Sequence, residues 1–120
     1  MQHTLMFTGD VNLMNVTDPA APFARVADVL RSADVLFGNL ECCLYATAKE
    51  RSVLDEGFYA LPAAGRALVA AGYHAVGAAN NVTYGAEAIT SSLAELDRLG
   101  IRHRSEEHTS ELQSQFRISY

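Results

Sequence analysis

Short apolar runs recur along the chain, and each stops at glycine or polar residues after about the length of a buried strand. The complete runs are Leu5–Thr8, Val35–Phe37 and Tyr73–Ala78, and a further run begins at Ile101. We therefore predict a strand at each of these positions, with the last one interrupted soon after it starts.

The segments between these runs carry apolar residues at helical spacing, with polar residues on the opposite face. They predict helices over residues 22–33, 62–71 and 86–99. A proline begins the first two segments and a glycine follows the last two, as is common at helix ends. Residues 42–57 show no regular pattern and are expected to form a long loop.

Strands that alternate with helices favour a mostly parallel sheet, because each helical crossover returns the chain in the same direction. The predicted class is therefore α/β, and a chain of 120 residues has room for one domain. In such a sheet the carboxyl ends of the strands share one edge, where ligands bind. We expect a functional site at that edge.

Oxygen-bearing side chains follow three of the predicted strands, in the segments Gly9–Asn12, Gly38–Glu41 and Ala79–Asn81. Carboxylate and amide oxygens suit divalent cations such as Mg, Mn or Fe(II). Each segment also has an ordinary structural interpretation. Asp10 is a suitable residue to cap a turn, a single Glu41 is commonly solvated, and consecutive asparagines readily form a turn.

Charge and composition narrow the classes of function. The chain has 9 Lys and Arg against 14 Asp and Glu, a formal net charge of -5, which predicts no general nucleic-acid partner. No apolar run is long enough to span a bilayer, and the first residues do not resemble an export signal. We therefore expect a cytoplasmic location, although a longer parent protein could be membrane-associated. Adjacent Cys42 and Cys43 are expected to remain thiols.

The last part of the chain has a different character. Residues 104–120 show no apolar period, and Arg104–Ser114 resembles the in-frame translation of a sequencing adapter. We accordingly expect residues 1–103 to form part of a native domain and residues 104–120 to be non-native and disordered. On this interpretation His108 is not a metal ligand.

The motifs GDVNL, GNLE and AANN, in this order and separated by strand–helix units, resemble the capsule-synthesis CapA family, the poly-γ-glutamate capsule domain. This family is itself similar to calcineurin-like metallophosphatases. The resemblance covers about residues 4–103. It implies the N-terminal βαβαβα portion of a metallophosphatase-like sandwich, truncated here, and a parent that acts in poly-γ-glutamate capsule biosynthesis as a metal-dependent hydrolase.

The resemblance also implies roles for individual residues. Asp10, Glu41 and Asn81 correspond to metal-binding positions, with Asn39 and Asn80 beside them as supporting residues. The implied cofactor is a divalent metal (Mn, Fe or Mg) in the intact parent, which this fragment is not expected to hold tightly. The implied substrate is an anionic polymer or a phosphoester, and the fragment itself is expected to be inactive.

One departure from the family pattern leaves alternatives open. Many members have histidine after the paired asparagines, where this chain has Val82, and valine neither coordinates a metal nor transfers a proton. The family's later histidine motif is also absent from this sequence. A non-catalytic binding or scaffold protein that keeps the fold is therefore the main alternative, and an unrelated flavodoxin-like or Rossmann-like regulatory domain is a third.

Overall fold

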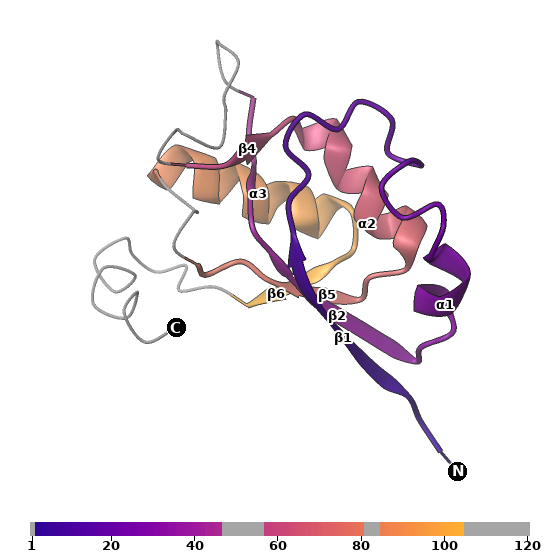
Figure 1. Cartoon of the computed structure of the whole chain (residues 1–120). Helices are drawn as coiled ribbons and strands as arrows, with labels where there is room; N and C mark the ends of the chain where they lie inside the picture. Colours follow the sequence, from indigo (N-terminus) through magenta and orange to yellow (C-terminus); the bar gives the residue numbers. More distant parts are fainter. Residues whose placement is uncertain (1, 47–56, 81–84, 105–120) are drawn as a thin grey trace.

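The computed structural model of the chain describes residues 2–46, 57–80 and 85–104 (Figure 1). In chain order its elements are β1 (Leu5–Val11), α1 (Ala27–Arg31), β2 (Val35–Leu40), β3 (Cys43–Leu44), β4 (Tyr59–Ala60), the 3-10 helix η1 (Pro62–Gly65), α2 (Arg66–Ala71), β5 (Ala75–Gly77), α3 (Ala86–Arg98) and β6 (Arg102–Arg104).

Four of these strands form one parallel sheet in the order β1-β2-β5-β6, which confirms the predicted α/β class with a mostly parallel sheet. These four strands lie side by side in the same order as in the chain. Because strand–helix–strand connections share one handedness, their helices then lie on the same face of the sheet. Helix α1 packs against α2, and α3 packs against η1, so the helices form a single layer (Figure 1).

The two faces of this sheet have different surroundings. On the helix side the core contains the fully buried side chains Leu36, Leu40 and Val76. On the other side, Leu5 is 61% exposed, Phe7 72% and Val35 41%. Within the described residues, helices therefore cover one face of the sheet, and apolar side chains are exposed on the other, which we call the uncovered face.

The first predicted helix is shorter than its sequence pattern suggests. Residues 22–26 form tight turns, in which Ala24 N donates to Ala21 O at 3.3 Å and Val26 N donates to Phe23 O at 3.0 Å. A regular α-helix begins only at Ala27. The prediction of a helix from residue 22 was therefore wrong over its first half, because a chain can present apolar residues at helical spacing through successive turns.

The second predicted helix is confirmed over residues 62–71, as the 3-10 turn η1 followed by α2. It ends at Gly72, whose φ of 88° lies in the left-handed region that favours glycine. The Arg31 guanidinium donates to the carbonyl oxygens of Val69 and Ala70 at this end of α2. These bonds link α1 to α2. They also place a positive charge at the C-terminus of α2, where it is stabilised by the helix dipole.

The predicted long loop of residues 42–57 contains an unexpected strand. This strand is β3, which pairs in parallel with β4 just after the loop: Cys43 pairs with Tyr59, and Leu44 pairs with Ala60. Helix α3 also holds β3, because Leu44 N donates to Ser92 Oγ and Ser91 Oγ donates to Leu44 O at 2.8 Å. These bonds explain why a polar Ser92 is buried.

The fourth strand is also present, as β6. It follows Ile101 and runs to Arg104, the first residue of the segment predicted to be non-native. Ala78 N donates to Arg104 O at 2.8 Å, a backbone bond that any residue at this position can accept. Residues 105–120 lie outside the described residues, so their predicted disorder stays a prediction.

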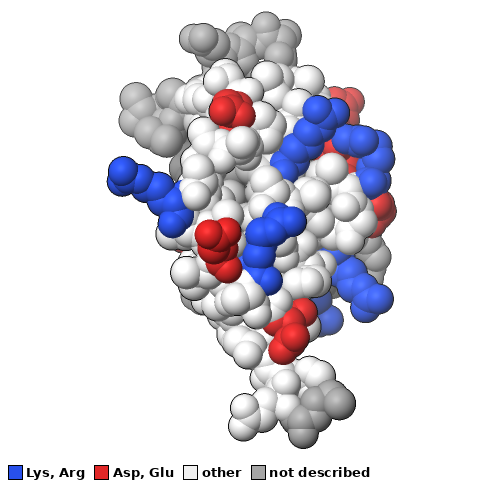
Figure 2. All heavy atoms as spheres, turned by 90° about the vertical axis from the view of Figure 1, so that its right-hand side faces the viewer, with Lys and Arg blue, Asp and Glu red and all other residues white. Residues whose placement is uncertain are grey.

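Acidic and basic side chains are interspersed on the side of the molecule that carries α1 (Figure 2). Helix α3, with 13 residues, is the longest helix of the described part. None of the helices described over residues 2–46, 57–80 and 85–104 has the length and apolar character to cross a membrane.

Strand β2 continues through Gly38 and Asn39, where the sequence predicted that it stops. Gly38 faces the helix layer, and a Cβ on it would lie 2.5 Å from Thr8 Oγ1 and 2.9 Å from Tyr73 Cε1. These two atoms belong to side chains joined by a 2.8 Å hydrogen bond between Thr8 Oγ1 and Tyr73 Oη. Gly38 is therefore a packing requirement of the strand and does not end it.

We predict that Gly38→Ala lowers the free energy of unfolding by about 1–3 kcal/mol, the usual cost of overpacking a core. Urea unfolding followed by circular dichroism measures this change. The matched control is Gly9→Ala in the neighbouring strand, where a Cβ meets nothing within 4 Å. We expect the control to stay within about 0.5 kcal/mol of the unchanged chain. Equal effects of the two substitutions would contradict the packing argument.

Candidate functional site

An irregularity in β1 determines which way Asp10 points. Phe7 pairs with Phe37 of β2, but Asp10 pairs with Asn39, so β1 has one more residue than β2 over this interval. In regular pairing Gly9 would lie opposite Asn39, and Asp10 would turn toward the helix layer with Leu40. The extra residue instead places Asp10 on the uncovered face, next to Asn39.

A chain of hydrogen bonds joins the carboxyl ends of three neighbouring strands. Asn39 Nδ2 donates to Asp10 Oδ1 at 2.8 Å. Asn80, which is 8% exposed just after β5, donates through Nδ2 to Asn39 Oδ1 at 3.3 Å and to Leu40 O at 2.8 Å. The two acceptors orient the Asn80 amide, and its bond to Asn39 Oδ1 orients the Asn39 amide. Asn39 in turn holds the Asp10 carboxylate.

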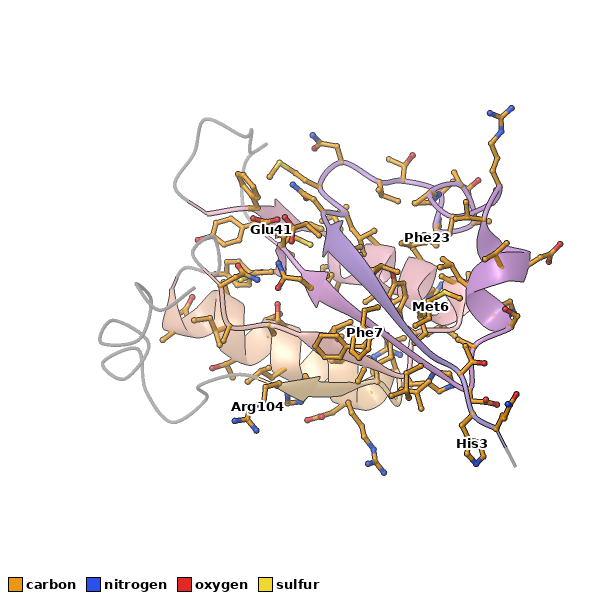
Figure 3. The ribbon with its side chains drawn as sticks, turned by 60° about the horizontal axis from the view of Figure 1, so that its bottom comes forward. His3, Met6, Phe7, Phe23, Glu41 and Arg104 are labelled. Atoms are coloured by element: carbon orange, nitrogen blue, oxygen red, sulfur yellow. The ribbon has the colours of Figure 1, made fainter. Side chains whose placement is uncertain are left out.

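Glu41 lies beside Asp10 because the backbone continues the pairing of β1 and β2. Glu41 N donates to Val11 O at 2.8 Å. Figure 3 shows Glu41 next to the arrowheads of these strands. The predicted convergence of strand-end segments at one edge is thus seen for Asp10, Asn39, Glu41 and Asn80 within the described part of the chain.

The carboxyl groups of Asp10 and Glu41 are joined by a side-chain hydrogen bond. This bond raises the pKa of Glu41, and burial and the negative charge of Asp10 raise it further. The same bond, together with the one from Asn39, lowers the pKa of Asp10. Between the lowered pKa of Asp10 and the raised pKa of Glu41, the two carboxyl groups therefore share one proton.

The neighbouring thiol does not join this chemistry. Cys42 is buried, accepts a 3.5 Å hydrogen bond from Leu13 N, and has its pKa raised by burial to about 12. It is therefore protonated at neutral pH, and a protonated thiol is neither a strong nucleophile nor a metal ligand. Cys42 and Cys43 are both thiols, which confirms the prediction, and both are buried.

The described residues include two carboxyl groups of the kind that cation sites use. Asp10 and Glu41 offer two neighbouring carboxyl groups, which hard divalent cations prefer. No group of three or more His, Cys, Asp or Glu side chains suited to a metal occurs within residues 2–46, 57–80 and 85–104. The third predicted ligand, Asn81, and the unusual Val82 lie outside the described residues.

Two features of the site were missed by the sequence analysis. The extra residue in β1 leaves a trace in the sequence. Thr8 and Val11 both face the helix layer but are three positions apart, whereas residues on one face of a regular strand are separated by an even number of positions. The bonds of Asn80 to Asn39 and to the Leu40 carbonyl have no local signal, since they join residues about forty positions apart.

Comparison with known proteins gives a family match and one similar protein. The family described as "Bacterial capsule synthesis protein PGA_cap" matches residues 4–118. The chain is also similar to the protein named "Uncharacterized protein y4sH" of Sinorhizobium fredii (strain NBRC 101917 / NGR234), with 32% identity over 111 residues. That alignment covers 83% of this chain and 24% of the relative, so the chain spans about a quarter of the relative's length.

The shared proton predicts a pH dependence of stability. Because the pKa of Glu41 is raised in the folded state, the stabilisation from its protonated form is complete below the ordinary glutamate pKa of about 4.3 and is lost as the pH rises through the raised value. Asp10 stays ionised over this range because its own pKa is lowered. Glu41→Gln keeps a neutral donor to Asp10 at every pH.

We therefore expect the unchanged chain to lose stability relative to Glu41→Gln as the pH rises from about 4.3 toward neutrality. Urea unfolding at a series of pH values, with a chelator present, measures the difference. Asp28→Asn, at an exposed acid in the first turn of α1, is the control and should not change the pH profile. Parallel profiles for the unchanged chain and Glu41→Gln would exclude the shared proton.

Proposed function

The chain belongs to the bacterial capsule synthesis protein family PGA_cap, and we propose that its parent protein is a metal-dependent hydrolase of the metallophosphatase type. The proposed substrate is an anionic capsule polymer such as poly-γ-glutamate, or a phosphoester. The observation that supports this most directly is the pairing of Asp10 with Glu41 at the carboxyl edge of a parallel sheet. Metal identity, substrate and reaction are parts of the proposal.

The argument for a cation begins with the charge of the pair. Two carboxyl groups in contact cannot both ionise without repulsion, so one proton remains between them. A divalent cation would relieve the same repulsion, and both carboxylates would hold it. Asn39 supports this because its hydrogen bond to Asp10 Oδ1 holds the carboxylate in one orientation beside Glu41.

The proposed ligands are Asp10 and Glu41 through carboxylate oxygens and Asn81 through its amide oxygen. Asn39 and Asn80 would orient these ligands by the hydrogen bonds described above. A bound Mn, Fe or Mg ion polarises a phosphoryl or carbonyl oxygen and makes bound water more acidic. The role of this chain is thus to fix two carboxylates at one edge of a rigid sheet, where an anionic substrate can approach the cation.

A non-catalytic binding or scaffold protein is the second candidate, and Val82 supports it. Many relatives of the resembled family have histidine at this position, and valine supplies neither a ligand nor a proton. Metal analysis of the purified relative from Sinorhizobium fredii would separate the two. Near-stoichiometric Mn, Fe or Mg favours the hydrolase, and its absence favours the scaffold.

The proposed metal ligands can be tested directly with this chain. Because the fragment is not proposed to hold metal tightly, the test must detect weak binding. In a 15N-labelled sample, we predict that small amounts of Mn²⁺ broaden the side-chain amide signals of Asn39 and Asn80, because a paramagnetic ion between Asp10 and Glu41 would lie close to them. Asp10→Asn should abolish the selective broadening. Asp28→Asn, which removes an equal charge on α1, should leave it unchanged.

Broadening that persists in Asp10→Asn, or that centres on exposed acidic residues elsewhere, would contradict the proposed ligand set. Amide spectra recorded before Mn²⁺ is added show whether each variant is folded. Hydrolysis is then tested in the longer relative, with a variant at its residue aligned with Asp10.

A further inference from the structure

Strands β2 and β5 are joined by side chains at both ends of a short backbone pairing. The pairing itself consists of three residue pairs. Beyond its carboxyl end, Asn80 Nδ2 donates to Leu40 O at 2.8 Å. Beyond its amino end, the His74 ring accepts a hydrogen bond from Leu36 N. Two side chains therefore extend a pairing that the backbone keeps short.

The joint at the amino end consists of two reciprocal hydrogen bonds. Leu36 N donates to His74 Nδ1 at 2.9 Å, and His74 N donates to Leu36 O at 3.0 Å. Both backbone groups that Leu36 directs toward β5 are thus bound by one residue, and one of the two bonds depends on a side chain.

The His74 ring replaces a backbone acceptor. Strand β5 begins at Ala75, because the chain arrives from α2, which ends at Gly72 with a left-handed φ of 88°. In a longer parallel strand, a carbonyl oxygen would accept from Leu36 N. Leu36 is 0% exposed, and a buried N–H group without an acceptor is costly. The imidazole therefore supplies what the short strand does not.

This replacement makes the joint sensitive to protons. A ring nitrogen accepts a hydrogen bond only when it is unprotonated, so His74 must be neutral with its proton on Nε2. A carbonyl oxygen has no such requirement. In the protonated ring Nδ1 also carries a hydrogen, and two N–H groups then face each other. His74 is exposed, so protons reach the ring from solvent.

Two other histidines of the described part have the opposite dependence. His3 Nδ1 lies 3.9 Å from Asp34 Oδ2, and His103 Nε2 lies 2.9 Å from Asp97 Oδ1. A carboxylate partner favours the protonated imidazole, whereas the bond from Leu36 N requires the neutral one. The charged and titratable side chains described on the elements around the joint are Asp28 and Arg31 on α1, Arg66 on α2, Tyr73 before β5, His3 before β1, Asp34 before β2, and Arg102, His103 and Arg104 on β6.

We propose that the bond between Leu36 and His74 is an acid-sensitive joint between β2 and β5, closed when His74 is neutral and opened when its ring is protonated. Opening loosens the amino ends of the two strands and leaves the bonds of Asn80 at their carboxyl ends in place. The proposal does not depend on metal binding or hydrolysis, and its residues lie within the segment 1–103 that the sequence predicts to be native.

Hydrogen exchange of the Leu36 amide, measured by NMR at about pH 7.5 and about pH 5.5, tests the proposal. Protection factors are compared, since they remove the intrinsic pH dependence of exchange. In the opened joint the solvated ring has the ordinary histidine pKa of about 6.5, so about nine in ten rings are protonated at the lower pH. We therefore expect the protection of Leu36 to fall about tenfold. The reference is the Cys43 amide, which donates to Phe58 O at 2.7 Å in the other sheet and should keep its protection.

Two variants separate the hydrogen bond from other effects of pH. His74→Asn places an amide oxygen near the position of Nδ1, and this oxygen accepts at every pH, so Leu36 should stay protected at both pH values. His74→Leu removes the acceptor and should leave Leu36 weakly protected at both. The matched control is His103→Asn, at a histidine that binds a carboxylate, and it should retain the fall of about tenfold.

Equal protection of Leu36 at the two pH values would overturn the proposal, and so would a fall that Cys43 shares, because it would indicate a change of the whole molecule. A fall that persists in His74→Asn would assign the effect to another group and would also overturn it. Full protection in His74→Leu would show that the ring is not needed. A chelator is present throughout, so each outcome is independent of the proposed hydrolase.

Discussion

One extra residue in the edge strand β1 controls the chemistry of the described site. Side chains of a strand alternate between its faces, so inserting one residue exchanges the face of every residue that follows. At Asp10 the exchange moves a carboxylate out of an apolar layer, where an unpaired charge would be strongly unfavourable, to the side of Asn39. Val11 then returns to the buried side, and the core of the strand is kept.

Most of the fold was predictable because a buried sheet and its helices need regular apolar patterns. The segments that became β1, α2, α3 and the start of β6 were located within a few residues. The failures concern local geometry. Residues 22–26 have helical periodicity but form turns, and Gly38 interrupts an apolar run although the strand continues through it. Pairing with β1 and β5 extends β2, and this partner-dependent effect has no local signal.

The candidate site was predictable only in outline. Parallel topology brings strand ends together, so the proximity of Asp10, Asn39 and Asn80 follows from the fold class. Which amide holds which carboxylate depends on register, and register depends on an irregular residue in β1. The raised pKa of Glu41 depends on its contact with Asp10, which spacing along the sequence does not define.

The order of strands across the sheet, which equals their order along the chain, also bears on how the molecule is made. Within the described four-stranded sheet, each strand pairs with the strand of that sheet that precedes it in the chain, so none of these four strands is inserted between two others. Domains commonly fold as they leave the ribosome, starting from the N-terminal end. A sheet that grows at one edge suits this process, because each strand–helix unit can dock on a completed surface as it emerges.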